Sequence, residues 1–191
     1  QSENTTYVDA LNNIFNKKFL KILKRLGKDC YNHGIAWLYP YYSPEGEFKI
    51  KRIDPLEVIP VWKDNDREEL DYVIRMYIVR KFEKGKFADT TKVEVYTSNG
   101  IEYYLWKNNS LSIDPERTKT TYLAIKDEEG KEKGFNWNKI PFVCFRPDEL
   151  EQPLIKRVKS LQDGINVILS DFQNNMQEDS RNTIIVIKNY D

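Results

Sequence analysis

The sequence contains one histidine, His33, and two cysteines, Cys30 and Cys144, among its 191 residues. A Ser-His-Asp triad needs a histidine held beside its partners, whereas His33 falls at the end of a predicted helix. The cysteines lie far apart and form no C-x-x-C motif. We interpret them as two reduced, packed thiols and not as a disulfide framework or a metal site. The phosphate loops G-x-x-x-x-G-K-[ST] and G-x-G-x-x-G are absent as well. The sequence therefore predicts no catalytic residue, no metal and no cofactor.

The sequence also lacks an excess of charge of either sign. Thirty Lys and Arg residues balance thirty Asp and Glu residues, which gives a formal net charge of zero. This balance excludes a basic field over the whole domain, of the kind that grips nucleic acid, so any contact with DNA would be local or weak. No apolar run reaches the length of about 20 residues that a membrane-spanning helix needs. We therefore expect no membrane contact.

Large apolar side chains, in contrast, are plentiful. Apolar residues make up 40% of the chain and aromatic residues 13%, which is enough to build a core and argues against disorder. The hydrophobic pattern changes twice along the chain. It predicts an α+β fold made of an N-terminal helix, an antiparallel β meander and a long C-terminal helix.

The first segment, residues 6–33, has the period of an amphipathic helix. Its apolar residues recur at steps of three and four, and Gly34 follows as a helix-ending glycine. The rest of its surface is crowded with cations: Lys17, Lys18, Lys21, Lys24, Arg25 and Lys28. This basic face is either a contact surface for DNA or an acidic partner, or a solvated face that the helix dipole favours near the C-terminus.

The second segment, residues 35–145, consists of short runs of β-forming residues separated by turn signals. Asn99-Gly100 lies between two such runs and predicts a tight hairpin. Pro55 and Pro60 flank residues 56–59, which places that stretch at a sheet edge or in a loop. Seven runs are expected to supply an antiparallel meander of about five or six strands: residues 35–42, 48–53, 70–82, 93–97, 101–107, 122–126 and 137–145. Residues 127–134 are expected to form a solvated turn.

Two clusters in this segment have a functional and a structural interpretation. Carboxylates crowd the stretch from Asp64 to Asp71, namely Asp64, Asp66, Glu68, Glu69 and Asp71. They could clamp metal ions for a nuclease, or they could face water in a polar turn. Aromatic residues alternate with lysine at Tyr103, Tyr104, Trp106 and Lys107. They could stack on single-stranded bases or pair across a sheet.

The third segment is a helix from residue 153 or 154 to residue 179, with a continuous apolar stripe. At 1.5 Å per residue it would be about 38 Å long, which is longer than a sheet of this size can cover. A neighbouring copy of the protein is the simplest candidate to bury the rest of the apolar stripe. Gly164, in the middle of the helix, marks either a close backbone approach or a bend.

The charges on this helix run against the helix dipole. Lys156 and Lys159 fall in its first turns, and Asp171 and Glu178 fall toward its end, where the dipole favours the opposite signs. Each such placement costs only about 0.3–1 kcal/mol. The charges are therefore either incidental or placed to contact a partner or to face the lumen of a channel.

The apolar run at residues 183–187 predicts a new strand just before residue 191. An unpaired apolar edge invites association with another chain, so we expect the sequence to be a piece of a longer protein.

Four motifs, taken in order, resemble the portal protein family of tailed double-stranded DNA bacteriophages, of the siphovirus type found in phages and prophages of Gram-positive bacteria. They are CYNHGIAW (residues 30–37), IDPLEVIPVW (53–62), KIPFV (139–143), and VKSLQDGIN (158–166), which runs through LSDF (169–172) into IIVIK (184–188). None is a catalytic fingerprint, and the resemblance lies in their order along the whole chain. The family's N-terminal segment and everything after the first strand of its clip are missing here.

This resemblance implies a role for each part of the chain. Residues 1–150 would form most of a wing-like α+β domain, residues 151–179 a stem helix along the channel of a dodecameric ring, and residues 180–191 the start of the clip. The ring would occupy the portal vertex of the virion after assembly in the host bacterial cytoplasm, and double-stranded DNA would pass through it. Its partners would be the terminase, the head-tail connector or adaptor, and the capsid and scaffold proteins. The expected channel-lining or interface residues are Lys156, Lys159, Asp163, Asp171, Asn174, Asn175 and Glu178.

Two other functions remain open at this point. One is a metal-dependent phage nuclease that uses the Asp64 to Asp71 cluster. The other is a tail or baseplate interaction module, which would share the mixed α+β composition. The module would leave unexplained why a long helix is followed by a new strand.

Overall fold

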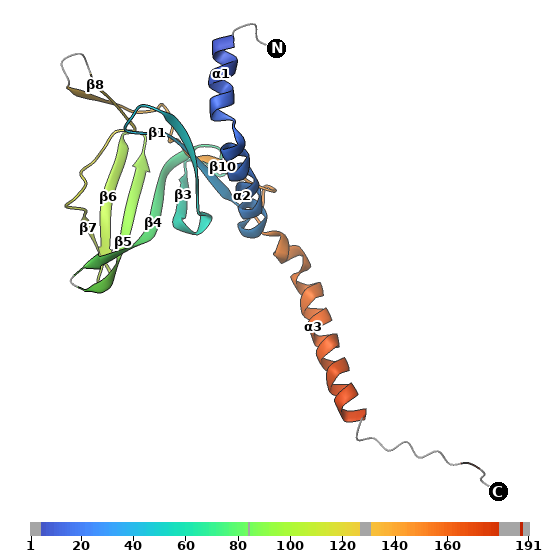
Figure 1. Ribbon diagram of the computed structural model, residues 1–191. Coiled ribbons are helices and arrows are strands. Elements are labelled where there is room, and N and C mark those ends of the chain that lie inside the picture. Colours follow the sequence, from blue (N-terminus) through green and yellow to red (C-terminus); the bar gives the residue numbers. More distant parts are fainter. Residues whose placement is uncertain (1–4, 84, 127–130, 180–187, 189–191) are drawn as a thin grey trace.

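The structure is a computed structural model that describes residues 5–83, 85–126, 131–179 and 188. Two helices come first, antiparallel sheets follow, and a long helix ends the described chain (Figure 1). This arrangement confirms the predicted α+β fold. The elements are α1 (Thr5–Ile14), α2 (Lys17–His33), β1 (Ala36–Tyr42), β2 (Phe48–Ile53), η1 (Pro55–Glu57), β3 (Val58–Trp62), β4 (Leu70–Glu83), β5 (Lys86–Thr97), β6 (Gly100–Lys107), β7 (Ser110–Ile113), β8 (Leu123–Lys126), β9 (Glu132–Phe135), β10 (Val143–Phe145) and α3 (Leu154–Asp179). The strand predicted at residues 183–187 lies outside the described residues.

The strands that the structure describes form three antiparallel sheets. The first has the order β10-β1-β2, the second β3-β4-β5-β6-β7, and the third is the β8-β9 hairpin. The predicted Asn99-Gly100 hairpin is confirmed, since Thr97 pairs with Gly100 at the β5-β6 turn. Residues 58–62 form an edge strand of the second sheet, which confirms the position inferred from the flanking prolines.

The prediction of one unbroken helix over residues 6–33 is wrong. The chain leaves helical geometry at Asn16, whose backbone is extended and whose side chain accepts hydrogen bonds from the Lys18 and Phe19 amides, at 2.8 and 3.2 Å. Asn16 is thus the N-cap of a new helix, a role that asparagine favours. The predicted helix end is confirmed, because Gly34 is left-handed (φ 80°) and its amide bonds to the Cys30 carbonyl.

The predicted meander of five or six strands is too simple. β7 was missed, and only residues 143–145 of the expected strand 137–145 pair in a sheet. The expected turn at 127–134 is wrong at its end, because Glu132–Phe135 pairs with Leu123–Lys126 as β9. Short strands with few apolar residues, such as β7 and β9, give little period-two signal.

β1 lies between the two main clusters of buried side chains. Trp37 and Tyr39 point to one side and pack with residues of the second sheet and with Phe142. Ala36 and Leu38 point to the opposite side and pack against Leu26 and Cys30 of α2. The alternation of side chains along a strand lets β1 join α2 to the sheets. Both cysteines are free thiols, as predicted, and burial raises the pKa of Cys144 to about 11.

A buried ionic network connects β4 and β5. The Glu94 carboxylate, 5% exposed, accepts hydrogen bonds from the hydroxyls of Tyr77 and Tyr96, at 2.8 and 2.6 Å, and from the Arg75 guanidinium at 3.2 Å. Arg75 also donates two hydrogen bonds to Glu57, which precedes β3. Each charged group is therefore paired, as buried charges need to be.

We predict that this part of the fold unfolds at alkaline pH. Burial raises the pKa of Tyr39, Tyr77, Tyr96 and Tyr122 well above the ordinary value of 10, and the Glu94 charge raises it further for Tyr77 and Tyr96. The stability that this adds is fully present below pH 10 and is lost as the pH rises above 10, because the unfolded state releases these protons more readily. Absorbance at 295 nm should show these tyrosines ionising together with loss of the circular dichroism signal. Ionisation of all tyrosines near pH 10 in a folded protein would contradict the prediction.

Candidate functional site

Helix α3 presents a long apolar surface that its own chain leaves uncovered. Figure 1 shows the helix leaving the sheets near its first turn and extending away from them. At 1.5 Å per residue its 26 residues span about 39 Å. Its large apolar residues are all 45–68% exposed: Leu154, Ile155, Val158, Leu161, Ile165, Val167, Ile168, Leu169, Phe172 and Met176. The helix is unbroken, and a side chain at Gly164 would point into open space. Neither a break nor a close contact with the described chain occurs there.

Most apolar residues of α3 occupy one face and most polar residues the opposite face, with Val167 as an apolar exception on the polar face. At about 100° per residue, Leu161, Ile165 and Phe172 project within about 40° of one another, and most of the apolar set projects with them. Lys156 and Asn174 project in the opposite direction, about 180° from Ile165. The helix therefore combines one face suited to packing against protein with one face suited to water.

The structure brings the predicted site residues together on that polar face. Lys156, Lys159, Asp163, Asp171 and Asn174 are exposed and lie within about 120° of arc on the helix. Asn175 is exposed at the border of this face. Glu178 belongs to α3, but its side chain lies outside the described part. The polar face carries two lysines and two aspartates, and Glu178 follows on the same side in the sequence, so the face has no excess of positive charge.

The base of α3 is fixed to the remainder of the chain by close backbone contact. Gly34, at the end of α2, lies against Glu151 so closely that a Cβ atom on Gly34 would be 2.0 Å from the Glu151 carbonyl oxygen. Glu151 itself has a positive φ of 51°, a conformation that non-glycine residues rarely adopt. Sequence reasoning identified Gly34 only as a helix end, because the partner segment is more than 100 residues away.

Ion pairs hold the same base in place. The Glu151 carboxylate pairs with Arg67 and lies 3.7 Å from the Arg146 guanidinium. Asp148 pairs with Arg157 in the first turn of α3 and accepts a hydrogen bond from the Gln152 amide at 3.4 Å. These contacts link α3 to the β3–β4 loop and to the segment after β10. The direction of the helix is thereby set by α2 and the sheets together.

The Asp64 to Asp71 cluster forms a turn. Asp64 accepts hydrogen bonds from the Glu68 and Glu69 amides at 3.0 and 3.1 Å, and these bonds lower the pKa of Asp64. Glu69 forms a salt bridge with Lys63 at 3.0 Å. Within the described residues, no three His, Cys, Asp or Glu side chains are grouped to hold a metal ion. The contacts favour the polar turn over a nuclease centre.

The aromatic cluster on β6 has structural contacts. The Tyr103 hydroxyl lies 3.0 Å from the Thr120 hydroxyl, and the Tyr104 hydroxyl donates to Glu102 at 2.8 Å. Trp106 is 39% exposed. Two of the three rings are thus held within the sheet, which favours the structural interpretation over base stacking. None of the described helices is both long enough and apolar enough to cross a membrane.

The fold and the site define a class of protein, namely an α+β subunit with a long, uncovered amphipathic helix that is attached at one end. The family model for phage portal proteins of the SPP1 Gp6-like type matches residues 5–191, and the chain belongs to this family. It is 28% identical over 191 residues to the portal protein of Bacillus phage SPP1, covering 100% of this chain and 37% of that protein. It is 26% identical over 197 aligned positions to the portal protein of Clostridium phage phiCD119, covering 98% of this chain and 40% of that protein. The chain thus spans about two fifths of the length of these relatives.

Proposed function

We propose that the chain is the wing-and-stem part of a phage portal subunit, which assembles with copies of itself into a ring around a channel for double-stranded DNA. Residues 1–150 are the wing, residues 151–179 the stem helix and residues 180–191 the start of the clip. The observation that carries this proposal is the division of α3 into an uncovered apolar face and an opposite polar face. Membership of the portal family supports it independently.

The two faces of α3 have separate roles in this proposal. The apolar face packs against neighbouring copies, which removes the exposed stripe from water. The polar face, with Lys156, Lys159, Asp163 and Asp171, lines the channel. The lack of excess positive charge on this face suits a passage through which DNA slides, because a strongly basic wall would hold the phosphates. Asn174, Asn175 and Glu178 continue this face toward the far end of the helix.

The ring acts as a structural conduit in the virion, at the vertex where DNA is packaged and later ejected. It docks the terminase, which supplies ATP hydrolysis, and then the head-tail connector, and it contacts capsid and scaffold proteins. Assembly takes place in the host bacterial cytoplasm. The chain contributes no catalytic group and no cofactor site to these steps.

The test is to image the full-length protein that contains this chain by electron microscopy. We expect closed rings with a central channel and with α3 beside it. DNA binding by the purified rings should be weak and should change little with salt, because few phosphates are neutralised. A full-length protein that stays monomeric, or rings in which α3 lies on the outer surface, would contradict the proposal.

A further inference from the structure

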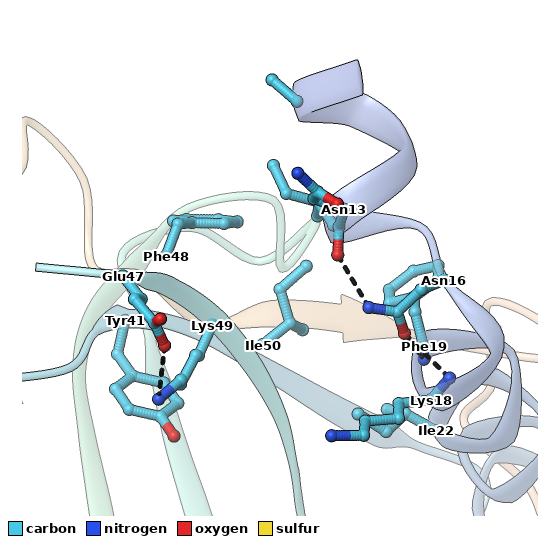
Figure 2. A pocket seen from close by; sticks show the side chains of 12 residues that line it. Asn13, Asn16, Lys18, Phe19, Ile22, Tyr41, Glu47, Phe48, Lys49 and Ile50 are labelled. Atoms are coloured by element: carbon cyan, nitrogen blue, oxygen red, sulfur yellow. Dashed lines mark hydrogen bonds and ion pairs between the residues drawn. The ribbon is translucent and has the colours of Figure 1, made fainter. Parts of the chain in front are cut away.

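A half-open groove lies where α1, α2 and the β1–β2 hairpin meet. Its volume is about 710 Å³, and Figure 2 shows the side chains that line it. The floor is apolar and half-buried, made of Ile14, Phe19, Ile22, Phe48 and Ile50. The break at Asn16 separates α1 from α2, and both helices contribute to the groove, with Phe19 and Ile22 of α2 half-buried in its floor.

The rim of the groove is basic. Lys18, Lys49 and Glu47 line it, and Lys49 forms a salt bridge with Glu47 at 3.0 Å, so Lys18 supplies the excess positive charge. Lys18 forms no ion pair within the described part of the chain, and the same holds for Lys17 and Lys21 beside it. An apolar side chain next to a carboxylate would therefore complement both the floor and the rim.

The chain carries such a combination at the base of α3. Leu150 is 70% exposed and is preceded by Glu149. Asp66 and Glu68 of the β3–β4 loop line the same hollow as these two residues. Within the described residues, the carboxylates of Asp66, Glu68 and Glu149 form no ion pair. Arg67 and Arg146 line this hollow as well, but both are paired with Glu151. Leu150 is thus an apolar knob beside three carboxylates that form no ion pair.

The knob and the groove lie at opposite ends of α2. The groove is at its first turn, and the knob is next to Glu151, which contacts Gly34 just after its last turn. A helix of 17 residues is about 25 Å long, so one chain cannot close the two onto each other. A contact between two different patches is heterologous, and it propagates from copy to copy instead of closing as a dimer. This is the geometry that a ring requires.

We propose that Leu150 of one copy is seated in the groove of the next copy, with Glu149 facing Lys18. This contact rests on the proposed ring. It adds a second contact between neighbouring copies, which lies on the wing and is separate from the apolar face of α3. It also gives the basic face of α2 a partner, the acidic surface around the knob.

A disulfide trap tests the contact in the full-length protein. Ala10 lines the groove and is exposed, so the double variant Ala10→Cys/Leu150→Cys should join neighbouring copies under mild oxidation. A non-reducing gel should then show a ladder of covalent multimers. The matched control is Ser110→Cys/Leu150→Cys, since Ser110 is exposed on β7, away from the groove, and should give no ladder.

A charge swap provides the second readout. Lys18→Glu or Glu149→Lys alone should weaken ring assembly about two- to fivefold, and the double variant should restore it. Rings without a ladder, or a double variant no better than either single variant, would overturn the contact and leave the proposed function standing. If the groove instead binds a different acidic protein, no ladder will form, and this outcome also contradicts the contact between copies. If the unmodified protein forms no rings, both the proposed function and this contact are contradicted.

Discussion

Replacing Leu161 and Phe172 on α3 by aspartate is expected to abolish ring assembly while leaving the wing folded. Both side chains are more than 60% exposed within one subunit, so the isolated fold does not depend on them. In the ring they would be buried, and each contributes about 1.5–3 kcal/mol per interface. A carboxylate in their place costs more, because burying an unpaired charge is strongly unfavourable. The same loss of binding free energy occurs at every interface between neighbouring copies in the ring.

Sedimentation velocity of the full-length variant should show monomers, and circular dichroism should show an unchanged fold. Asn174→Asp provides the matched control, since it introduces the same carboxylate on the opposite face of the same helix. The control should still form rings. Intact rings with both aspartates in the apolar face would show that this face is not an interface.

Replacing Gly34 by alanine is expected to lower the free energy of unfolding by about 3 kcal/mol or more. A left-handed backbone costs a non-glycine residue about 1–2 kcal/mol, and the added Cβ would lie 2.0 Å from the Glu151 carbonyl oxygen. That neighbour is backbone and cannot rotate away. The segment before α3 must move, so the base of α3 is displaced as well.

Two other glycines separate the cost of the left-handed backbone from the cost of the close contact with Glu151. Gly46 has a similar φ of 81° but open space around it, so Gly46→Ala should lose only the conformational part, about 1–2 kcal/mol. Gly27 lies inside α2 with nothing within 4 Å, so Gly27→Ala should stabilise the protein by up to about 1 kcal/mol. Urea unfolding of the three variants measures all of these values. Equal losses for Gly34→Ala and Gly46→Ala would rule out the contact with Glu151.

The features predicted correctly from the sequence are those set by local chemistry. The end of α2 at Gly34, the Asn99-Gly100 hairpin and the continuous helix after Pro153 each depend on a few adjacent residues. The uncovered stripe on α3 followed from its length alone. That the polar residues opposite this stripe line a channel or an interface stays a prediction.

The features that were missed depend on distant contacts or on competing local signals. The apolar period runs through Leu11, Phe15 and Phe19 without interruption, and it concealed the cap at Asn16. The Arg75 and Glu94 network needs the register of β4 against β5, which no local pattern fixes. The packing of Gly34 on Glu151 joins segments that only the folded sheets bring together. The groove and its complementary knob were missed for the same reasons.

The attachment of α3 at one end only has a mechanical consequence. The helix behaves as a lever about 39 Å long, with the cluster around Glu151 and Asp148 as its fulcrum. A tilt of about 5° at that fulcrum would swing the far tip by roughly 3 Å, given the rise of an α-helix. In the proposed ring, a small displacement at the base of α3 would thus be magnified at its far end and would change the width of the channel there.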